Sequence, residues 1–185
     1  MTTIAAHTPG TPGWFNLTSS DAAAARSFYG ALFGWTFVLA GPELGHHATA
    51  LLDERPAAGI GGTPPGVELP SAWSVFFIGP DADLAARQIA DAEGTVVMGP
   101  VDIGEDGRML LATDATGAAF GVWQPGRHVG ARAVNEPGAM GWCEVNTRDA
   151  TRAGAFYQAV FGLAPRPLAA PGMTYHTLHT SGVAS

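Results

Sequence analysis

Histidines are the side chains in this sequence best suited to chemistry near neutral pH. His46 and His47 adjoin each other in a stretch of strand-like composition, so only one of them can face a given side of a sheet. Because imidazole titrates near neutrality, that residue could act as a metal ligand or a general base. A histidine exposed at a strand edge is the alternative interpretation. Tyr175 and His176 form a similar pair, and Glu144 is either a further candidate base or a polar rim residue.

Several familiar catalytic groups are missing from the sequence. It contains no nucleophile elbow, no phosphate-binding loop and no dinucleotide-binding fingerprint. The single cysteine, Cys143, excludes an internal disulfide and a metal cage of several thiolates, and fits a small core side chain. The acidic stretch from Asp102 to Asp106 is typical of a solvated loop. The sequence therefore does not predict a hydrolase.

The charge balance restricts the class of partner. Nine Lys and Arg residues stand against sixteen Asp and Glu residues, which gives a net charge of -7 and a pI near 5.2. Nucleic acids and anionic membranes need clustered cations, so neither is expected as a partner. No apolar run is long enough to span a membrane, and the N-terminus lacks the pattern of a secretory signal. We expect a cytoplasmic protein.

An internal repeat indicates the elements that must position these residues. The segment beginning at Trp14 aligns without gaps with the segment beginning at Trp142, so the repeat offset is 142 - 14 = 128. A fainter half-repeat begins at Trp73. Its capping residue Asp81 follows Asp21 by 81 - 21 = 60 positions, so the repeating unit is about 60 residues long. The matching pairs are Trp14 with Trp142, Asp21 with Asp149, Phe28 and Tyr29 with Phe156 and Tyr157, and Phe33 and Gly34 with Phe161 and Gly162.

Each unit predicts a strand, a helix and three further strands. Asp21 suits the N-cap of a helix over residues 21–33, alanines favour the helix, and Gly34 can take the left-handed conformation that ends it. Phe28 and Leu32 lie four residues apart and predict an apolar face packed in the core. Further strands are expected at 35–40, 46–52 and 57–62, and then at 74–78, 95–99, 108–114 and 119–124, with a second helix over about 82–93.

Three motifs within the repeat resemble the vicinal oxygen chelate superfamily of glyoxalases, bleomycin-resistance proteins and extradiol dioxygenases. They are the D-x(6)-FY-x(3)-FGW run ending at Trp35, its copy ending at Gly162, and the segment from Gly107 to Gln124. The resemblance covers nearly the whole chain from Trp14 onward. It implies an α+β fold in which paired βαβββ units form a half-open barrel around a ligand cavity, followed by a partial third unit. It does not identify a substrate.

Metal-dependent members of that superfamily hold a divalent ion with His, Glu or Gln at set strand positions. The resemblance places those positions at Trp14, Trp73 and Gly121, none of which can bind a metal. Replacing three ligands with two indoles and a glycine removes the charge that would hold a divalent cation. We therefore expect no metal and no other cofactor in this cavity.

Strand alternation predicts which residues line the cavity that the resemblance implies. Aromatic faces with a few polar groups suit a flat aromatic or apolar ligand. The alternative is that the tryptophans simply fill the cavity. The predicted ligand-binding residues are Trp14, Asn16 and Thr18 on one strand, Trp73, Val75 and Phe77 on another, Gly121 and Trp123 on a third, and His47.

The repeat also predicts the domain organisation. We expect a disordered tail at residues 1–12, a complete module of two βαβββ units at 13–125, a linker at 126–138 and a partial second module at 139–185. Since 185 - 128 = 57, the second copy stops part-way, with a strand at 141–147, a helix at 150–161 and a strand at 174–180. Its open sheet edge could pair in a homodimer or pack on the first module. A longer natural chain is the other explanation.

Three functional hypotheses follow from the sequence. The leading one is a metal-free protein that binds a small aromatic or apolar molecule, such as an aromatic metabolite or an antibiotic. The second is an enzyme of secondary metabolism or detoxification, with dioxygenase, lyase or hydroxylase-like activity. The third is a structural module whose barrel is plugged by its own tryptophans.

Overall fold

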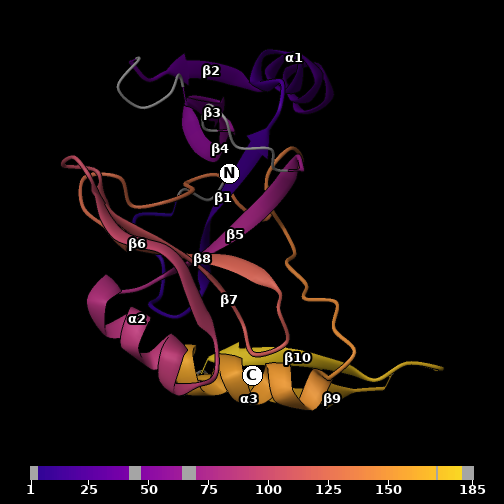
Figure 1. The fold of residues 1–185 in the computed structure, drawn as a ribbon. Coiled ribbons are helices and arrows are strands. Elements are labelled where there is room, and N and C mark those ends of the chain that lie inside the picture. The colour runs from indigo at the N-terminus through magenta and orange to yellow at the C-terminus, as the bar shows by residue number, and fades with distance from the viewer. Residues whose placement is uncertain (1–3, 42–46, 64–69, 170, 181–185) are drawn as a thin grey trace. The chain divides into compact units, whose positions relative to one another are not determined.

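The computed structural model of the chain describes residues 4–41, 47–63, 70–169 and 171–180 (Figure 1), so His46 lies outside the described residues. The chain divides into two compact units. Unit 1 comprises Met1–His7, Gly13–Phe76 and Val129–Cys143, and unit 2 comprises Thr8–Pro12, Phe77–His128 and Glu144–Ser185. Each unit combines helices with mainly antiparallel strands, which confirms the predicted α+β class.

Unit 1 has the predicted order of one strand, one helix and three strands. Its strands are arranged in the order β2-β3-β4-β1, with β4 parallel to β1 and the other neighbours antiparallel. Trp14 and Phe15 are adjacent on β1 and both are buried, so both faces of this strand are covered. The elements are β1 (Pro12–Ser19), α1 (Ala22–Phe33), β2 (Thr36–Leu39), β3 (Ala48–Leu52) and β4 (Arg55–Gly62).

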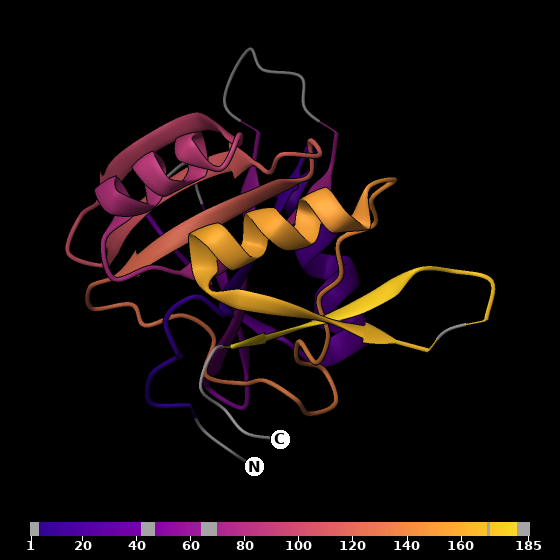
Figure 2. The ribbon, with the colours of Figure 1, turned by 90° about the horizontal axis from the view of Figure 1, so that it is seen from below.

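Unit 2 repeats this order. Strand β5 (Ala72–Ile78) carries the chain from unit 1 into unit 2. The antiparallel strands β8, β7 and β6 follow one another in the sheet, and α2 lies across them (Figure 2). Ala82, Ala85 and Ile89 are buried because their spacing places them on one side of the helix. The elements are α2 (Ala82–Asp91), β6 (Thr95–Ile103), β7 (Gly107–Thr113) and β8 (Ala119–Pro125).

The second copy of the repeat begins with a helix of the predicted length. Helix α3 (Ala150–Phe161) is followed by the antiparallel hairpin of β9 (Leu163–Leu168) and β10 (Tyr175–Thr180), which extends beside the helix (Figure 2). The predicted strand at 141–147 is wrong, because those residues form no strand. In unit 1 the equivalent strand β1 pairs with β4, whose counterpart would begin at 55 + 128 = 183, outside the described residues.

The N-terminal residues differ from the expected disordered tail. In unit 1, His7 Nε2 lies 2.7 Å from the carbonyl oxygen of Ala131. In unit 2, the Gly10 amide donates to the Ile78 carbonyl over 2.7 Å, and Gly10 is buried. Residues 4–12 therefore belong to the folded part of the chain. The other predicted domain boundaries stay predictions.

The segment expected as a linker packs into unit 1. Trp35 Nε1 donates to the Gly138 carbonyl over 2.7 Å. Arg55 and Glu136 form an ion pair at 2.5 Å with both side chains largely buried. Each partner favours the charged form of the other, so the pKa of Glu136 is lowered. These contacts fasten residues 129–143 to β4.

None of the described helices has the length and apolar character needed to cross a bilayer.

Candidate functional site

Asn16 and His47 form the polar pair at the centre of unit 1. Asn16 lies on β1, and His47 immediately precedes β3. Asn16 Oδ1 and His47 Nε2 are 2.6 Å apart, which is a short hydrogen bond between two side chains. The structure thus brings together two of the predicted ligand-binding residues that are 31 positions apart in the chain.

Two glycines of β4 make room for this pair. Gly59 stands opposite Asn16 in the parallel register of β1 and β4. A Cβ atom at Gly59 would overlap Asn16 Oδ1 and come within 2.7 Å of His47 Nε2, and one at Gly61 would lie 3.1 Å from His47 Cδ2. The imidazole therefore lies across a strand surface that only glycine leaves flat enough. These glycines were not among the predicted site residues, although their alternation at 59 and 61 was the available signal.

Burial controls the charge of the pair. Removal from water lowers the pKa of His47 below its ordinary value of 6.5, so the ring is neutral at pH 7. Because Asn16 Oδ1 can only accept, the proton shared by the pair belongs to His47 Nε2, and Nδ1 carries the lone pair. A neutral imidazole of fixed tautomer can accept a hydrogen bond or a proton at Nδ1. The pair offers polar recognition without a net charge.

The other predicted residues of unit 1 lie in different surroundings. Trp14 is only 6% exposed, and Thr18 stands opposite Gly61 in the register of β1 with β4. Val75 is half-buried. Trp73 lies in an aromatic cluster, where its Nε1 donates to the Tyr29 hydroxyl over 2.9 Å and its ring meets the Tyr29 ring edge-on at 5.3 Å. Trp73 is thereby engaged with helix α1.

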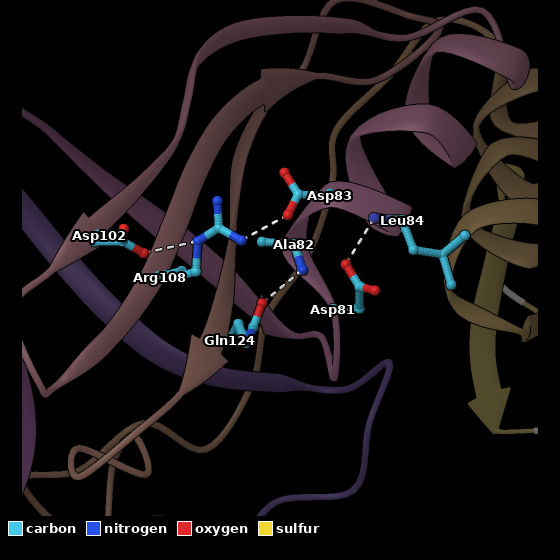
Figure 3. Close-up of polar contacts among 7 residues, drawn as sticks. All are labelled: Asp81, Ala82, Asp83, Leu84, Asp102, Arg108 and Gln124. Carbon is cyan, nitrogen blue, oxygen red and sulfur yellow. Dashed lines mark hydrogen bonds and ion pairs between the residues drawn. The ribbon is translucent and has the colours of Figure 1, made fainter.

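In unit 2, the polar contacts of α2 show which side chains of the sheet lie on the face that this helix covers. Arg108 of β7 reaches Asp83 of α2 at 2.5 Å and Asp102 of β6 at 2.8 Å (Figure 3). Gln124 stands opposite Arg108 in the register and accepts from the Ala82 amide at the start of α2. These side chains therefore share the face that α2 covers.

Alternation along β8 places Gly121 and Trp123 together on the other face of that sheet. They were expected to share a face. Trp123 is only 5% exposed. Its Nε1 donates to the His128 carbonyl over 2.8 Å, and the two rings meet edge-on at 5.5 Å. The indole is held in one orientation by these contacts.

Phe77 departs from the expected arrangement. Its ring lies 5.9 Å from that of Phe120, which is on the helix-bearing face of β8, and 4.4 Å from that of Phe161 of α3 in a stacked geometry. Phe77 was predicted to line the cavity, whereas it lies beneath α3. Strand alternation predicted which residues share a side but not which side the helix covers.

The second copy of the repeat carries a counterpart of the Asn16–His47 pair. The repeat offset places Glu144 at the position of Asn16 and Tyr175 at that of His47. The Tyr175 hydroxyl donates a hydrogen bond to the Glu144 carboxylate. The same two positions are therefore joined in both copies, but Glu144 is exposed.

The two cavities described in unit 2 do not contain the predicted ligand-binding residues. One, of about 710 Å³, is lined by the turn at Ala115–Ala118 and by residues 146–149 and 152. The other, of about 230 Å³, lies between Pro9 and Gly10, the end of β5, the start of α2 and the end of α3. Burial also raises the pKa of the Cys143 thiol, which does not favour a reactive thiolate.

Comparison with known proteins identifies the family. The sequence profile of the Glyoxalase/Bleomycin resistance protein/Dioxygenase superfamily matches residues 11–122. The chain belongs to this superfamily. Two similar curated proteins are the anthracycline biosynthesis proteins DauV of Streptomyces sp. (strain C5) and DnrV of Streptomyces peucetius. Each is 38% identical over 185 residues, a match that covers 92% of this chain and 67% of the relative.

Solved structures of the superfamily share the fold. The Mn(II)-bound glyoxalase from Novosphingobium aromaticivorans aligns with a TM-score of 0.61 and 12% identity, covering 91% of this chain and 57% of that one. The halotolerant catechol dioxygenase BphC aligns with a TM-score of 0.63 and 14% identity, covering 94% and 62% respectively. This chain therefore spans less than two thirds of the length of these superfamily structures.

The residues of this superfamily member do not fit a metal centre at the positions that the sequence resemblance indicates. Trp14 is a buried indole, Trp73 is hydrogen-bonded to Tyr29, and Gly121 has no side chain. Among the residues that the structure describes, no group of three His, Cys, Asp or Glu side chains comes together. Oxygen and nitrogen ligands in sufficient number are required to hold a divalent cation.

Proposed function

We propose that this protein binds a small aromatic or apolar molecule in its first module, residues 13–125, without a metal, and that the Asn16–His47 pair is the polar anchor of the site. The observation that carries the proposal is the short hydrogen bond between these two side chains over Gly59 and Gly61. A neutral, orientated polar pair amid apolar strands is the typical composition of a small-molecule site. The names of the Streptomyces relatives support a polycyclic aromatic class of ligand.

The chemistry of the pair favours a hydroxylated aromatic ligand. His47 is neutral and presents an acceptor at Nδ1, to which a phenolic hydroxyl can donate. The adjacent tryptophan position, Trp14, supplies apolar and stacking surface on the same side of β1. The net charge of -7 disfavours polyanionic partners, so nucleic acid and anionic membrane are not part of the proposal. We also propose a cytoplasmic location.

The test is a titration of the protein with a dihydroxyanthraquinone, followed by quenching of tryptophan fluorescence, with elemental metal analysis of the same sample. We expect saturable quenching without stoichiometric metal. Gly59→Ala should abolish saturation, because the new Cβ displaces both partners of the pair. Gly62→Ala is the matched control, since a Cβ there meets nothing within 4 Å. Equal binding by both variants would contradict the proposed site.

A second candidate is an enzyme of secondary metabolism, in keeping with the biosynthetic names of the relatives. Here His47, neutral at pH 7, would accept a proton from a bound phenol. Turnover of the anthraquinone probe by the native chain but not by His47→Gln would favour it. Stoichiometric metal would revive a metal-dependent reaction and end the metal-free proposal.

The third candidate, a plugged structural module, is favoured by the deep burial of Trp14 and Trp123. It predicts neither saturable quenching nor turnover with any aromatic probe. Sedimentation velocity of the same sample tests the expected homodimer, which stays a prediction. The three candidates thus give different results in one set of measurements.

A further inference from the structure

The side chains of Asn16 and His47 each keep one polar nitrogen outside their shared hydrogen bond. The bonded atoms are Asn16 Oδ1 and His47 Nε2, which lie 2.6 Å apart. Asn16 Nδ2 is a donor, and His47 Nδ1 is an acceptor because the ring is neutral. Among the residues that the structure describes, none forms a hydrogen bond with either nitrogen. The pair therefore presents one donor and one acceptor to a ligand.

The glycines of β4 fix the direction in which this donor and this acceptor lie. The ring atoms nearest to a Cβ built at Gly59 are Nε2 and Cε1, and the ring atom near Gly61 is Cδ2. The edge of the imidazole that carries Nε2 therefore faces the strand, and His47 Nδ1 lies on the edge away from it. Asn16 Nδ2 lies beyond Oδ1, at the other end of the bonded pair. The donor and the acceptor are thus at the two ends of the pair rather than side by side.

Such a pair selects its ligand by penalty as well as by attraction. Asn16 and His47 are both half-buried, and Trp14, on the same side of β1 as Asn16, is buried. A flat ligand that covers the pair removes water from both free nitrogens. A ligand that leaves either nitrogen without a partner then loses about tenfold in affinity. The preferred ligand therefore carries an acceptor for Asn16 Nδ2 and a donor for His47 Nδ1.

We propose that the Asn16–His47 pair selects a ring system that carries a carbonyl group and a hydroxyl group on separate positions of the rings. The carbonyl oxygen accepts from Asn16 Nδ2, and the hydroxyl donates to His47 Nδ1. A rigid ring system holds both groups at a fixed separation, so little freedom is lost on binding. Asn16 is then a specificity-determining residue as well as the group that orients His47. This inference rests on the proposed function, because it names the ligand class of the same site: a hydroxylated aromatic quinone or ketone.

Other ligand classes fit the pair less well. An aromatic carboxylate has no donor for His47 Nδ1, and it brings a charge that neither side chain of the pair neutralises. An aromatic hydrocarbon or ether covers the pair but leaves Nδ1 without a donor. A phenol without a carbonyl satisfies His47 but offers Asn16 Nδ2 no carbonyl oxygen. Only the combination of the two groups pairs both ends.

Three probes of similar size separate the two hydrogen bonds. The first is a monohydroxyanthraquinone whose hydroxyl is not adjacent to a carbonyl. The second is its methyl ether, which lacks the hydroxyl proton, and the third is the hydroxyanthracene of the same substitution, which lacks the carbonyls. Equilibrium dialysis gives the dissociation constant of each probe for the native chain. We expect the first probe to bind about tenfold more tightly than either of the others.

Two variants assign each preference to its side chain. His47→Phe should abolish the preference for the hydroxyl probe over its methyl ether. Asn16→Leu should abolish the preference for the quinone over the anthracene. Gly62→Ala is the matched control and should keep both preferences, since a Cβ there meets nothing within 4 Å. Each preference is a ratio of two affinities of one variant, so a uniform loss of affinity does not change it.

The outcomes separate this inference from the proposed function on which it rests. Equal affinity of the native chain for all three probes would overturn the inference and leave the ligand-binding function in place. Either preference persisting after loss of its own side chain would also overturn it, because another group would then recognise the ligand. If no probe binds saturably to the native chain, the proposed function fails and the inference fails with it. The comparison in the native chain holds even if a variant does not fold.

Discussion

Helices α1 and α3 begin and end in the same way but differ in what surrounds them. Asp21 and Asp149 each accept a hydrogen bond from the amide three residues later at 2.9 Å, and Gly34 and Gly162 end the helices with φ angles of 72° and 69°. Yet five residues of α3 are buried and no residue of α1 is. Local sequence therefore determines that a helix forms, whereas its contribution to stability depends on a neighbouring sheet.

The largest expected effect tests this difference directly. Phe156→Ala should lower the free energy of unfolding by about 3–5 kcal/mol, because it leaves a cavity among the rings of Phe77 and Phe120. Phe28→Ala, the same change at the equivalent position, should alter it by less than about 0.5 kcal/mol. Urea denaturation of both variants measures the two values. Similar losses in both would mean that Phe28 is covered in solution.

The same difference explains how much of the fold the sequence could predict. The capping Asp and the terminating Gly lie within a few residues of each helix, so the predicted bounds of 150–161 match α3. The predicted strand at 141–147 failed because a strand depends on a partner that is distant in sequence, as β1 depends on β4. Other strands were predicted within two residues of their bounds, as 57–62 for β4 and 119–124 for β8.

The candidate site was predictable only in part for a related reason. Asn16 and His47 were each identified by type and strand position, but nothing in the sequence joined them across 31 residues. Gly59 and Gly61 allow the pair to form, and a glycine's role depends on what approaches it. Phe77 was placed with the wrong neighbours because alternation does not reveal which face of a sheet a helix covers.

The duplicated hydrogen bond should show the second largest contrast. Asn16→Ala leaves the half-buried His47 donor without its acceptor, which should cost about 1–3 kcal/mol of stability. Glu144→Ala removes the equivalent acceptor from Tyr175 at an exposed position, so a change below about 0.5 kcal/mol is expected. Thermal unfolding of both variants provides the measurement. If Glu144→Ala is as costly as Asn16→Ala, the second pair is buried in solution.

Removing the N-cap residue should destabilise the first turn of α1 and that of α3 equally. Asp21→Ala and Asp149→Ala each remove one capping hydrogen bond, which should cost about 1 kcal/mol of helix stability at either site. Hydrogen exchange of the first-turn amides reports this local cost separately from global unfolding. Asn at either position should restore most of the protection, since its side chain also accepts at the N-cap. Unequal local costs would show that the two helices are not equivalent even in their first turns.

The smallest and most specific effect concerns pH. Burial lowers the pKa of folded His47 below 6.5, so the unfolded chain binds a proton at this residue more readily than the folded chain does. The contribution of neutral His47 to the free energy of unfolding is therefore fully present above pH 6.5. It begins to fall as the pH drops below that value, and it is fully lost below the lowered pKa of the folded state. The second copy has Tyr175 at this position and therefore no imidazole. His47→Gln should flatten the stability profile between about pH 7 and pH 5, while Tyr175→Phe should leave its slope unchanged. Denaturant titrations at several pH values measure both slopes, and a native profile no steeper than that of His47→Gln would show that the imidazole is solvated rather than held over Gly59 by Asn16.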